Sequence, residues 1–262
     1  MTDERLMAFR KDGIGHVVFN NPAKLNAVSR DMWQKLGDVL AEFAADGDVR
    51  AVVVSGAGGK AFVSGADISK FESERASQEA AAQYNATAAR AYEALYEFPR
   101  PTVARITGYC IGGGVNLAAC CDLRYCNEGA RFGVPAGKLG LGYGYAPVRR
   151  LAEIIGLPRT LEMIYTARQY SAAEAEAMGL VQRVAADADL EAVVDEVTRQ
   201  IGANAPMTLA LAKASASEIR KPEAKRDLAR LDRLAQACFD SADYAEGRKA
   251  FMERRKPVFR GK

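Results

Sequence analysis

The chain alternates between short apolar segments and longer segments with helical periodicity. Residues 51–54 form an unbroken apolar run that ends near Gly56, which is typical of a strand buried on both faces of a sheet. Three further segments are interpreted as strands: 14–20, 103–106 and 123–126. Strands that alternate with helices pair in parallel through helical crossovers, so the pattern predicts an α/β fold. The spacing between the units is irregular, which does not support a TIM barrel.

Helical segments fill the intervals between these strands. Apolar residues recur at helical spacing over 30–45, and Ser29 directly before them is the expected N-cap. The alanine-rich segment 73–98 predicts a long helix that ends before Pro99. A shorter helix is expected over 114–120.

The end of the chain has a different character from the rest. Residues 206–255 are helical in pattern, rich in charge and without a strand signal. We therefore predict a core over 1–200 and a helical C-terminal region over 201–262. Such a region is expected to pack on a neighbouring subunit or to cover a site.

Composition and charge exclude several classes of function. The 262 residues are 49% hydrophobic, which is enough for a large core. Lys and Arg total 36 against 33 Asp and Glu, so the concentrated basic excess of a nucleic-acid-binding protein is absent. No apolar run approaches the roughly 20 residues of a membrane helix, and the first residues lack a signal-peptide pattern. We expect a cytoplasmic protein with neither a nucleic-acid partner nor a membrane partner.

Cysteine and histidine usage limits the chemistry further. Five cysteines occur without C-x-x-C spacing, so reduced thiols are expected and no disulfide framework or metal site is predicted. His16 is the single histidine and lies in a strand pattern. A structural role for it is favoured, and mechanisms that need a catalytic histidine are therefore disfavoured.

Two glycine-containing turns carry the chemical signal. In segment 106–118 a strand enters Gly112-Gly113-Gly114 and a helix leaves it. Glycine allows close approach to bare backbone, and a helix N-terminus exposes unpaired N–H groups that suit an anion or a developing oxyanion. For an isolated triple glycine, tight helix–strand packing is the favoured interpretation. The Gly-Lys-Ser/Thr ending of a P-loop is missing. The second turn, over 61–68, contains Ser64-Gly65-Ala66-Asp67 and follows the buried strand.

Taken together, these turns and several other motifs resemble the enoyl-CoA hydratase/isomerase (crotonase) superfamily. The matching segments appear in the family's order along nearly the whole chain. They are NPAKLNA at 21–27, FVSGAD at 62–67, PRPTVA at 99–104, GY at 108–109, GGG at 112–114, CDL at 121–123, TAR at 166–168, Ala175 with MGLV at 178–181, and FMERRKP at 251–257.

The resemblance implies a fold, a ligand and an assembly. The fold would be a spiral of ββα units with C-terminal helices that mediate trimers, often paired into hexamers. The ligand would be a coenzyme A thioester, with no tightly bound cofactor. A thioester carbonyl gains negative charge when an enolate forms beside it, and each well-placed amide donor contributes roughly 3–4 kcal/mol to stabilising that charge.

The resemblance also implies roles for individual residues. The two oxyanion-hole amides map onto Ala66 and Gly113. The remaining expected substrate- and CoA-binding positions are Ala23, Lys24, Leu25, Ser64, Asp67, Ile68, Gly112 and Ala136. Lys249 and Lys256 are candidates to reach the adenosine phosphates of a neighbouring subunit, or are ordinary solvated charges.

The chain departs from the family at two positions. The family's hydratases carry one glutamate three residues after the oxyanion glycine, where this chain has Asn116. They carry a second one after the proline of a Phe-x-x-Pro segment, where this chain has Ala136. An asparagine side chain can orient a ligand through hydrogen bonds but does not transfer protons, and an alanine side chain can do neither. Hydration by two glutamates therefore cannot operate unchanged.

Three alternatives follow from these replacements. One is decarboxylation of a malonyl-type thioester, with Asn116 orienting the substrate and Tyr143 donating a proton. Another is hydratase or isomerase activity through a different acid, such as Asp67 or a glutamate near Glu72 or Glu74. The third is a CoA-ester-binding protein with weak or no turnover. The acyl pocket is expected between segments 73–98 and 132–145. Simple packing explains Tyr143 as well, and a turn or cap role is favoured for Asp67.

Overall fold

The computed structural model describes residues 4–67 and 77–262. The predicted α/β class is confirmed, and the described strands form two sheets. The larger sheet has the order β1 Leu6–Lys11, β2 Ile14–Phe19, β3 Ala51–Gly56, β5 Thr102–Ile106, β7 Leu123–Asn127 and β10 Arg183–Ala185. The smaller sheet has the order β4 Ala61–Val63, β6 Tyr109–Ile111, β8 Arg131–Gly133 and β9 Tyr170–Ser171.

Successive strands alternate between the two sheets, which produces the predicted ββα repeat. Strands β3, β5 and β7 pair in parallel in the larger sheet. Each is followed by a short strand of the smaller sheet, and these short strands, β4, β6 and β8, are also parallel to one another. Each turn of the chain therefore adds one strand to each sheet. As a result, the carboxyl ends of β4 and β6 lie side by side.

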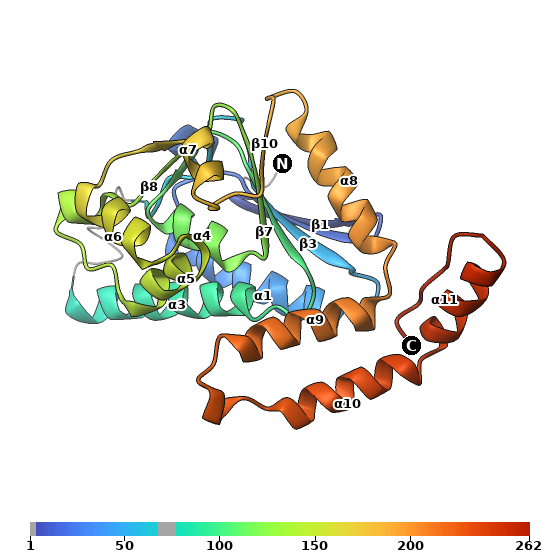
Figure 1. The fold of residues 1–262 in the computed structure, drawn as a ribbon. Helices are drawn as coiled ribbons and strands as arrows, with labels where there is room; N and C mark the ends of the chain where they lie inside the picture. The colour runs from blue at the N-terminus through green and yellow to red at the C-terminus, as the bar shows by residue number, and fades with distance from the viewer. Residues whose placement is uncertain (1–3, 68–76) are drawn as a thin grey trace.

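Helices cover both faces of the larger sheet (Figure 1). Their bounds are α1 Arg30–Ala45, α3 Gln78–Tyr96, α4 Gly113–Cys120, α5 Tyr145–Ile155, α6 Leu157–Thr166, α7 Ala172–Ala177 and α8 Leu190–Gly202. Along β3, Val52 and Val54 belong to the core shared with α1, α3 and α4. The alternate residue Val53 packs against α8 with Leu190 and Val194. This period-two alternation explains why the strand is apolar at every position.

The first helix start was predicted at Ser29, whereas the segment predicted as a helix over 73–98 forms α3 over Gln78–Tyr96 in the described residues. Ser29 stands at the N-cap of α1 as predicted, but its hydroxyl makes no capping bond and has no partner among the described residues. Ser77 begins α3 and accepts a hydrogen bond from the Ala80 N–H at 3.1 Å. The predicted position of the first helix start is therefore right, whereas the expected side-chain bond is absent.

The C-terminal helices are α9 Pro206–Ile219, α10 Leu228–Phe239 and α11 Ala242–Met252. The Lys213 ammonium on α9 contacts the Asp122 carboxylate of the core at 2.7 Å. No residue of α10 is buried, and Figure 1 shows α10 and α11 extending away from the sheets. This arrangement is consistent with a trimerisation region. Among the described residues, no helix has the length and apolar character of a membrane span.

Candidate active site

The two predicted turns meet at the end of the smaller sheet. One follows β4 and contains Gly65, and the other follows β6 and leads into α4 at Gly113. A β-carbon built on Gly113 would lie 3.8 Å from the Gly65 Cα. The parallel pairing of β4 with β6 causes this meeting, because the carboxyl ends of parallel strands share one edge of a sheet.

Close packing of α4 against β4 depends on Gly114. A β-carbon at this position would lie only 2.0 Å from the Val63 carbonyl oxygen. Any side chain would therefore push the first turn of α4 away from β4. The packing interpretation of the triple glycine is correct for Gly114, and it is compatible with a ligand-binding role for the neighbouring Gly113.

The amide of Ala66 points away from its neighbouring segment. Val28 and Ala66 form a parallel bridge in which the Val28 N–H donates to the Gly65 carbonyl at 2.9 Å. The Asp67 N–H donates to the Val28 carbonyl at 3.0 Å. Because Val28 bonds to the residues on either side of Ala66, the N–H of Ala66 is directed to the opposite side of the strand.

The amide of Gly113 is one of the free donors of a helix N-terminus. Gly112 has a positive φ of 56°, and its own N–H donates to the Gly133 carbonyl at 2.8 Å. Gly113 is the first residue of α4, so its N–H has no intrahelical acceptor. Within the described part of the chain, neither this N–H nor that of Ala66 donates to a backbone carbonyl.

The segment expected to bind CoA lies beside the first turn. Ala23 and Lys24 belong to the 3-10 helix η1 Pro22–Lys24. The Ser64 N–H donates to the Leu25 carbonyl at 3.2 Å, and the Ser64 hydroxyl approaches the Lys24 carbonyl at 3.4 Å. The Lys24 ammonium contacts the Asp67 carboxylate at 2.9 Å.

The Asp67 carboxylate therefore takes part in an ion pair between these two segments. Its side chain is only 3% exposed. The turn or cap role that the sequence favoured for Asp67 does not account for this ion pair. Ile68 and the candidate acids Glu72 and Glu74 lie outside the described residues.

Asn116 lies on the buried face of α4, one turn after Gly112, and is 5% exposed. The Tyr92 hydroxyl from α3 donates to the Gly113 carbonyl at 3.1 Å. Burial raises the pKa of Tyr92 well above its usual value, and the Asn116 amide opposes that rise. The Asn116 Oδ1 atom is buried and has no partner among the described residues.

Tyr143 packs against the same core cluster as α4. It lies between the 3-10 helix η3 Pro135–Leu139 and α5, and it packs against the core cluster that includes Cys120 of α4. Its hydroxyl is buried and unpartnered within the described residues. Burial raises the pKa of this hydroxyl well above its usual value, so it stays protonated at neutral pH. Ala136 lies in η3 and is buried.

Other residues considered from the sequence have structural contacts. His16 stacks on Phe9 of β1 with ring centroids 4.9 Å apart, and burial lowers its pKa. The Asp122 carboxylate accepts from the Thr102 N–H at 2.8 Å. The Arg124 guanidinium donates to the carbonyls of Leu180 and Cys121, both at 2.6 Å.

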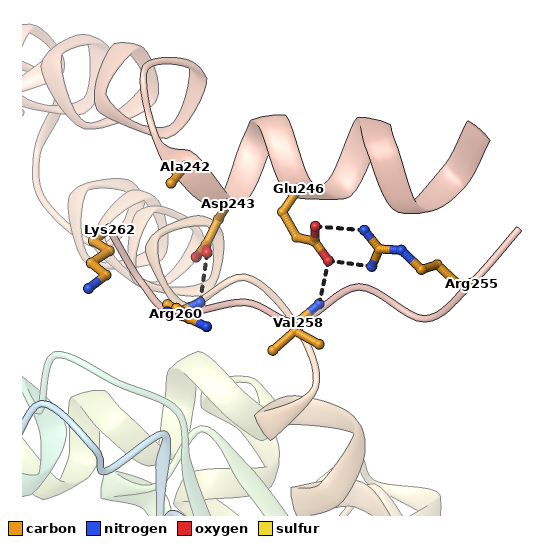
Figure 2. A pocket seen from close by; sticks show the side chains of 7 residues that line it. All are labelled: Ala242, Asp243, Glu246, Arg255, Val258, Arg260 and Lys262. Carbon is orange, nitrogen blue, oxygen red and sulfur yellow. Dashed lines mark hydrogen bonds and ion pairs between the residues drawn. The ribbon is translucent and has the colours of Figure 1, made fainter. Parts of the chain in front are cut away.

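A pocket of about 390 Å³ lies in the C-terminal region (Figure 2). The Arg255 guanidinium pairs with the Glu246 carboxylate, and the Asp243 carboxylate accepts from the backbone N–H groups of Arg260 and Gly261 at 2.7 Å. These contacts fasten the tail to α11. Lys249 lies on α11 and Lys256 in the tail, and both are exposed. Neither lines this pocket.

Tyr92 is the site residue that sequence reasoning missed. It lies within an alanine-rich helix, where nothing in its spacing separates it from the neighbouring buried residues Tyr84 and Tyr96. Only the contact between α3 and α4 reveals its role. The described residues contain no group of three His, Cys, Asp or Glu side chains placed to hold a metal ion.

The chain is similar to known proteins along almost its whole length. The Enoyl-CoA hydratase/isomerase family matches residues 10–262. A short-chain-enoyl-CoA hydratase from Clostridium acetobutylicum is 31% identical over 247 residues, which cover 94% of this chain and 94% of that protein. A peroxisomal Delta(3,5)-Delta(2,4)-dienoyl-CoA isomerase from Arabidopsis thaliana is 31% identical over 256 residues, covering 93% of this chain and 91% of the isomerase.

A solved structure shows the same fold. The crystal structure of an enoyl-CoA hydratase/carnithine racemase from Magnetospirillum magneticum matches with a TM-score of 0.94 and 34% identity. The match covers 99% of this chain and 96% of that chain. The spiral ββα architecture expected from the sequence motifs is therefore confirmed.

Proposed function

Because this chain belongs to the enoyl-CoA hydratase/isomerase family of acyl-CoA enzymes, we propose that it binds a CoA thioester and stabilises an enolate of that thioester. The N–H groups of Ala66 and Gly113 would donate to the thioester oxygen. The observation that carries the proposal is the meeting of the two turns, where a β-carbon built on Gly113 would lie 3.8 Å from the Gly65 Cα. Two such donors contribute roughly 3–4 kcal/mol each to stabilising an oxyanion.

Lys24, Leu25 and Ser64 support the same assignment. Their backbone and side-chain contacts hold η1 against the turn that contains Ala66. A CoA moiety lying along Ala23, Lys24 and Leu25 would therefore extend toward the Ala66 amide. Gly112, Ala136 and Asp67 are the further positions that we assign to substrate and CoA binding, and Ile68, assigned to the same role, lies outside the described residues.

Proton transfer in this chain would not use two glutamates, because Asn116 and Ala136 occupy their positions. Tyr143 is the group we assign as acid. Its hydroxyl is buried, unpartnered within the described residues and protonated at neutral pH. It can therefore donate a proton to the enolate carbon or to a leaving group, while it is a poor base.

Decarboxylation of a malonyl-type thioester is the second candidate. The unpartnered Tyr143 hydroxyl favours it, because the enolate that remains after loss of carbon dioxide needs one proton and no base. Asn116 would then orient the substrate. A hydratase or isomerase reaction through Asp67 is less favoured, because the Asp67 carboxylate is paired with Lys24.

The test compares turnover of crotonyl-CoA and methylmalonyl-CoA with calorimetric binding of butyryl-CoA. Turnover of crotonyl-CoA alone assigns hydratase chemistry, and turnover of methylmalonyl-CoA alone assigns decarboxylation. Tight binding of butyryl-CoA without either turnover assigns a CoA-ester-binding protein. No binding of any CoA thioester overturns the proposal.

A second experiment asks whether Asn116 and Ala136 replaced glutamates in an otherwise unchanged site. The double variant Asn116→Glu/Ala136→Glu should then hydrate crotonyl-CoA faster than the wild type. An unchanged rate would mean that the pocket is built for a different reaction.

Self-association is part of the proposal. The side chains of Phe239, Phe251 and Met252 on α10 and α11 are 60%, 83% and 82% exposed in the single chain. Burial of such residues stabilises subunit contacts by about 25 cal/mol per Å². We propose a cytoplasmic homotrimer or a dimer of trimers, in which Lys249 and Lys256 face a neighbouring subunit. Sedimentation analysis tests the assembly, and a monomer at micromolar concentration would contradict it.

A further inference from the structure

We propose that Arg150 is a positioning residue that holds α5 on α3 and thereby fixes Tyr143, which lies just before α5. This role rests on the proposed function, because Tyr143 is the acid assigned there. Arg150 does not touch the acyl group in this proposal, and it acts only through the placement of α5.

Arg150 is a buried cation that pairs with a carboxylate of a neighbouring helix. Its side chain is 3% exposed, and its Nη2 atom lies 2.5 Å from the Oε2 atom of Glu93 on α3. A buried charge is costly unless it is paired, so moving α5 away from Glu93 would leave the guanidinium without this partner. The pair therefore ties α5 to α3.

Tyr96 attaches the same two helices at a second point, one turn after Glu93. The Arg150 Cζ atom lies 4.7 Å from the centroid of the Tyr96 ring, a distance at which a cation and a ring attract each other. The Tyr96 hydroxyl donates to Oε2 of Glu153 on α5 at 2.7 Å. Arg150 and Glu153 are three residues apart and share one face of α5. Contacts between two positions on each helix fix the rotation of α5 as well as its distance from α3.

The loop before α5 depends on this attachment for its position. It contains Gly140, Gly142 and Gly144, and a β-carbon built on any of them would meet nothing within 4 Å. The loop backbone is therefore not closely packed at these three positions. Tyr143 directly precedes Gly144, the N-cap of α5, whose carbonyl accepts from the Val148 N–H at 3.4 Å. The placement of α5 therefore determines where the Tyr143 side chain begins.

The same turn of α3 also holds the start of α4. The Tyr92 hydroxyl donates to the Gly113 carbonyl at 3.1 Å, and the Gly113 N–H is one of the two amide donors that we propose. The next residue, Glu93, holds α5 through Arg150. One turn of α3 therefore sets the position of the assigned acid relative to the assigned donor. Proton transfer to an enolate requires such a fixed arrangement of acid and substrate.

The first test reports the position of Tyr143 without any substrate. 3-Fluorotyrosine is incorporated at position 143, and fluorine NMR spectra are recorded for the wild-type, Arg150→Met and Arg100→Met backgrounds. The wild-type background should give one resonance. The Arg150→Met background should give a shifted resonance or several resonances, because α5 is no longer held on α3.

Arg100→Met is the matched control for the loss of a buried arginine contact. The Arg100 guanidinium donates to the carbonyls of Phe43 and Ala44 at 2.7 and 3.1 Å, so it holds the end of α1 and not α5. This background should keep the wild-type fluorine resonance.

The second test is a double-mutant cycle on the turnover of methylmalonyl-CoA or crotonyl-CoA, whichever the wild type converts. Arg150→Met should lower kcat about tenfold and change KM by less than about twofold. In the Tyr143→Phe background the same change should lower kcat by less than about twofold, because the group that Arg150 positions is gone. Rates are compared at a temperature at which denaturation curves show every variant to be folded.

The outcomes separate the inference from the proposed function. The inference is overturned by an unchanged fluorine resonance in Arg150→Met, by an equal shift in Arg100→Met, or by an equal loss of kcat in both backgrounds. The proposed function survives each of these results. Conversion of neither thioester by the wild type removes the acid role of Tyr143 and the inference with it, whereas failure to bind butyryl-CoA overturns the proposed function itself.

A second variant keeps the test decisive if Arg150→Met does not fold. The Glu93 side chain is 58% exposed, so Glu93→Gln should fold, and glutamine keeps an acceptor without the charge. This variant should also shift the fluorine resonance of position 143, and an unchanged resonance overturns the inference.

Discussion

The Tyr92 hydroxyl and the Gly113 carbonyl are joined by a hydrogen bond of 3.1 Å. The bond ties the long helix α3 to the first residue of α4. The Gly113 carbonyl is therefore held by a side chain that belongs to another helix. Because α4 also packs on β4 through Gly114, the first turn of α4 is fixed from two directions.

Gly114→Ala should abolish thioester binding and destabilise the fold. The new methyl group would lie 2.0 Å from the Val63 carbonyl oxygen, so α4 must move away from β4. Overpacking of this kind costs about 1–3 kcal/mol. Chemical denaturation and calorimetric titration with butyryl-CoA measure the two effects.

Gly37→Ala is the control for that experiment. Gly37 lies within α1, and a β-carbon there meets nothing within 4 Å. This change should stabilise the protein by up to about 1 kcal/mol through helix propensity and leave binding unchanged. Wild-type binding by Gly114→Ala would contradict the packing described for α4.

Tyr143→Phe should separate stability from activity. The hydroxyl is buried without a partner among the described residues, so its removal should leave the free energy of unfolding unchanged or raise it by about 1–2 kcal/mol. If Tyr143 is the acid, turnover of the active substrate should fall at least about tenfold. Denaturant midpoints and steady-state rates provide the two measurements. Wild-type turnover by this variant would remove Tyr143 from the proposed site.

Alkaline pH should destabilise the protein through its buried tyrosines. Burial raises the pKa of both Tyr92 and Tyr143 in the folded state, whereas in the unfolded chain a tyrosine titrates near 10. The folded state therefore holds these protons more tightly, and their contribution to stability is full below about pH 10 and decreases as the pH rises above it. Urea denaturation at several pH values should show this decrease. The double variant Tyr92→Phe/Tyr143→Phe should show a shallower decrease, and an identical profile would contradict the assignment.

Asn116→Asp should be more damaging than Asn116→Leu. The aspartate would bury a negative charge on α4, where the Asn116 Oδ1 atom already has no partner among the described residues. A buried acceptor without a partner costs roughly 1–3 kcal/mol, and a charged one costs more.

The same substitution makes a prediction about pH. Burial should raise the pKa of the new carboxyl group. The loss of stability that its charge causes should therefore be absent at low pH and develop as the pH rises above about 4. Denaturation of the Asn116→Asp and Asn116→Leu variants between pH 4 and 8 measures the difference. Equal stability of these two variants at neutral pH would contradict the burial of an unpartnered polar group at position 116.

Much of the fold could be predicted from local pattern. The run 51–54 is apolar throughout because alternate residues face α1–α4 and α8, and this signal is strong in a single sequence. Gly112 was identifiable as a turn residue because its positive φ is a local backbone requirement, whereas the requirement for Gly114 comes from the packing of α4 on β4. The positions Asn116 and Ala136 could be compared with the family pattern because they follow short motifs.

The rest depended on contacts between distant segments. Nothing within residues 73–98 distinguishes Tyr92, because its role comes from α4. Asp67 was expected to act in a turn, and its pairing with Lys24 arises only where η1 meets the first turn. The predicted capping bond of Ser29 does not form, because the serine hydroxyl is buried and has no hydrogen-bond partner among the described residues. Residue propensity predicts where a helix starts, whereas the packing around the N-cap residue decides whether its capping hydrogen bond forms.

The meeting of the two turns has a consequence for how this site can be discovered experimentally. The donors that we propose at Ala66 and Gly113 belong to the main chain, so they have no functional group to alkylate, oxidise or titrate in the neutral range. Alanine-scanning mutagenesis would pass over position 66 entirely, since it is already alanine. A screen of side chains would draw attention to Asn116 and Tyr143. Finding the amide donors requires a probe of the backbone itself, such as hydrogen exchange at these two positions with and without ligand.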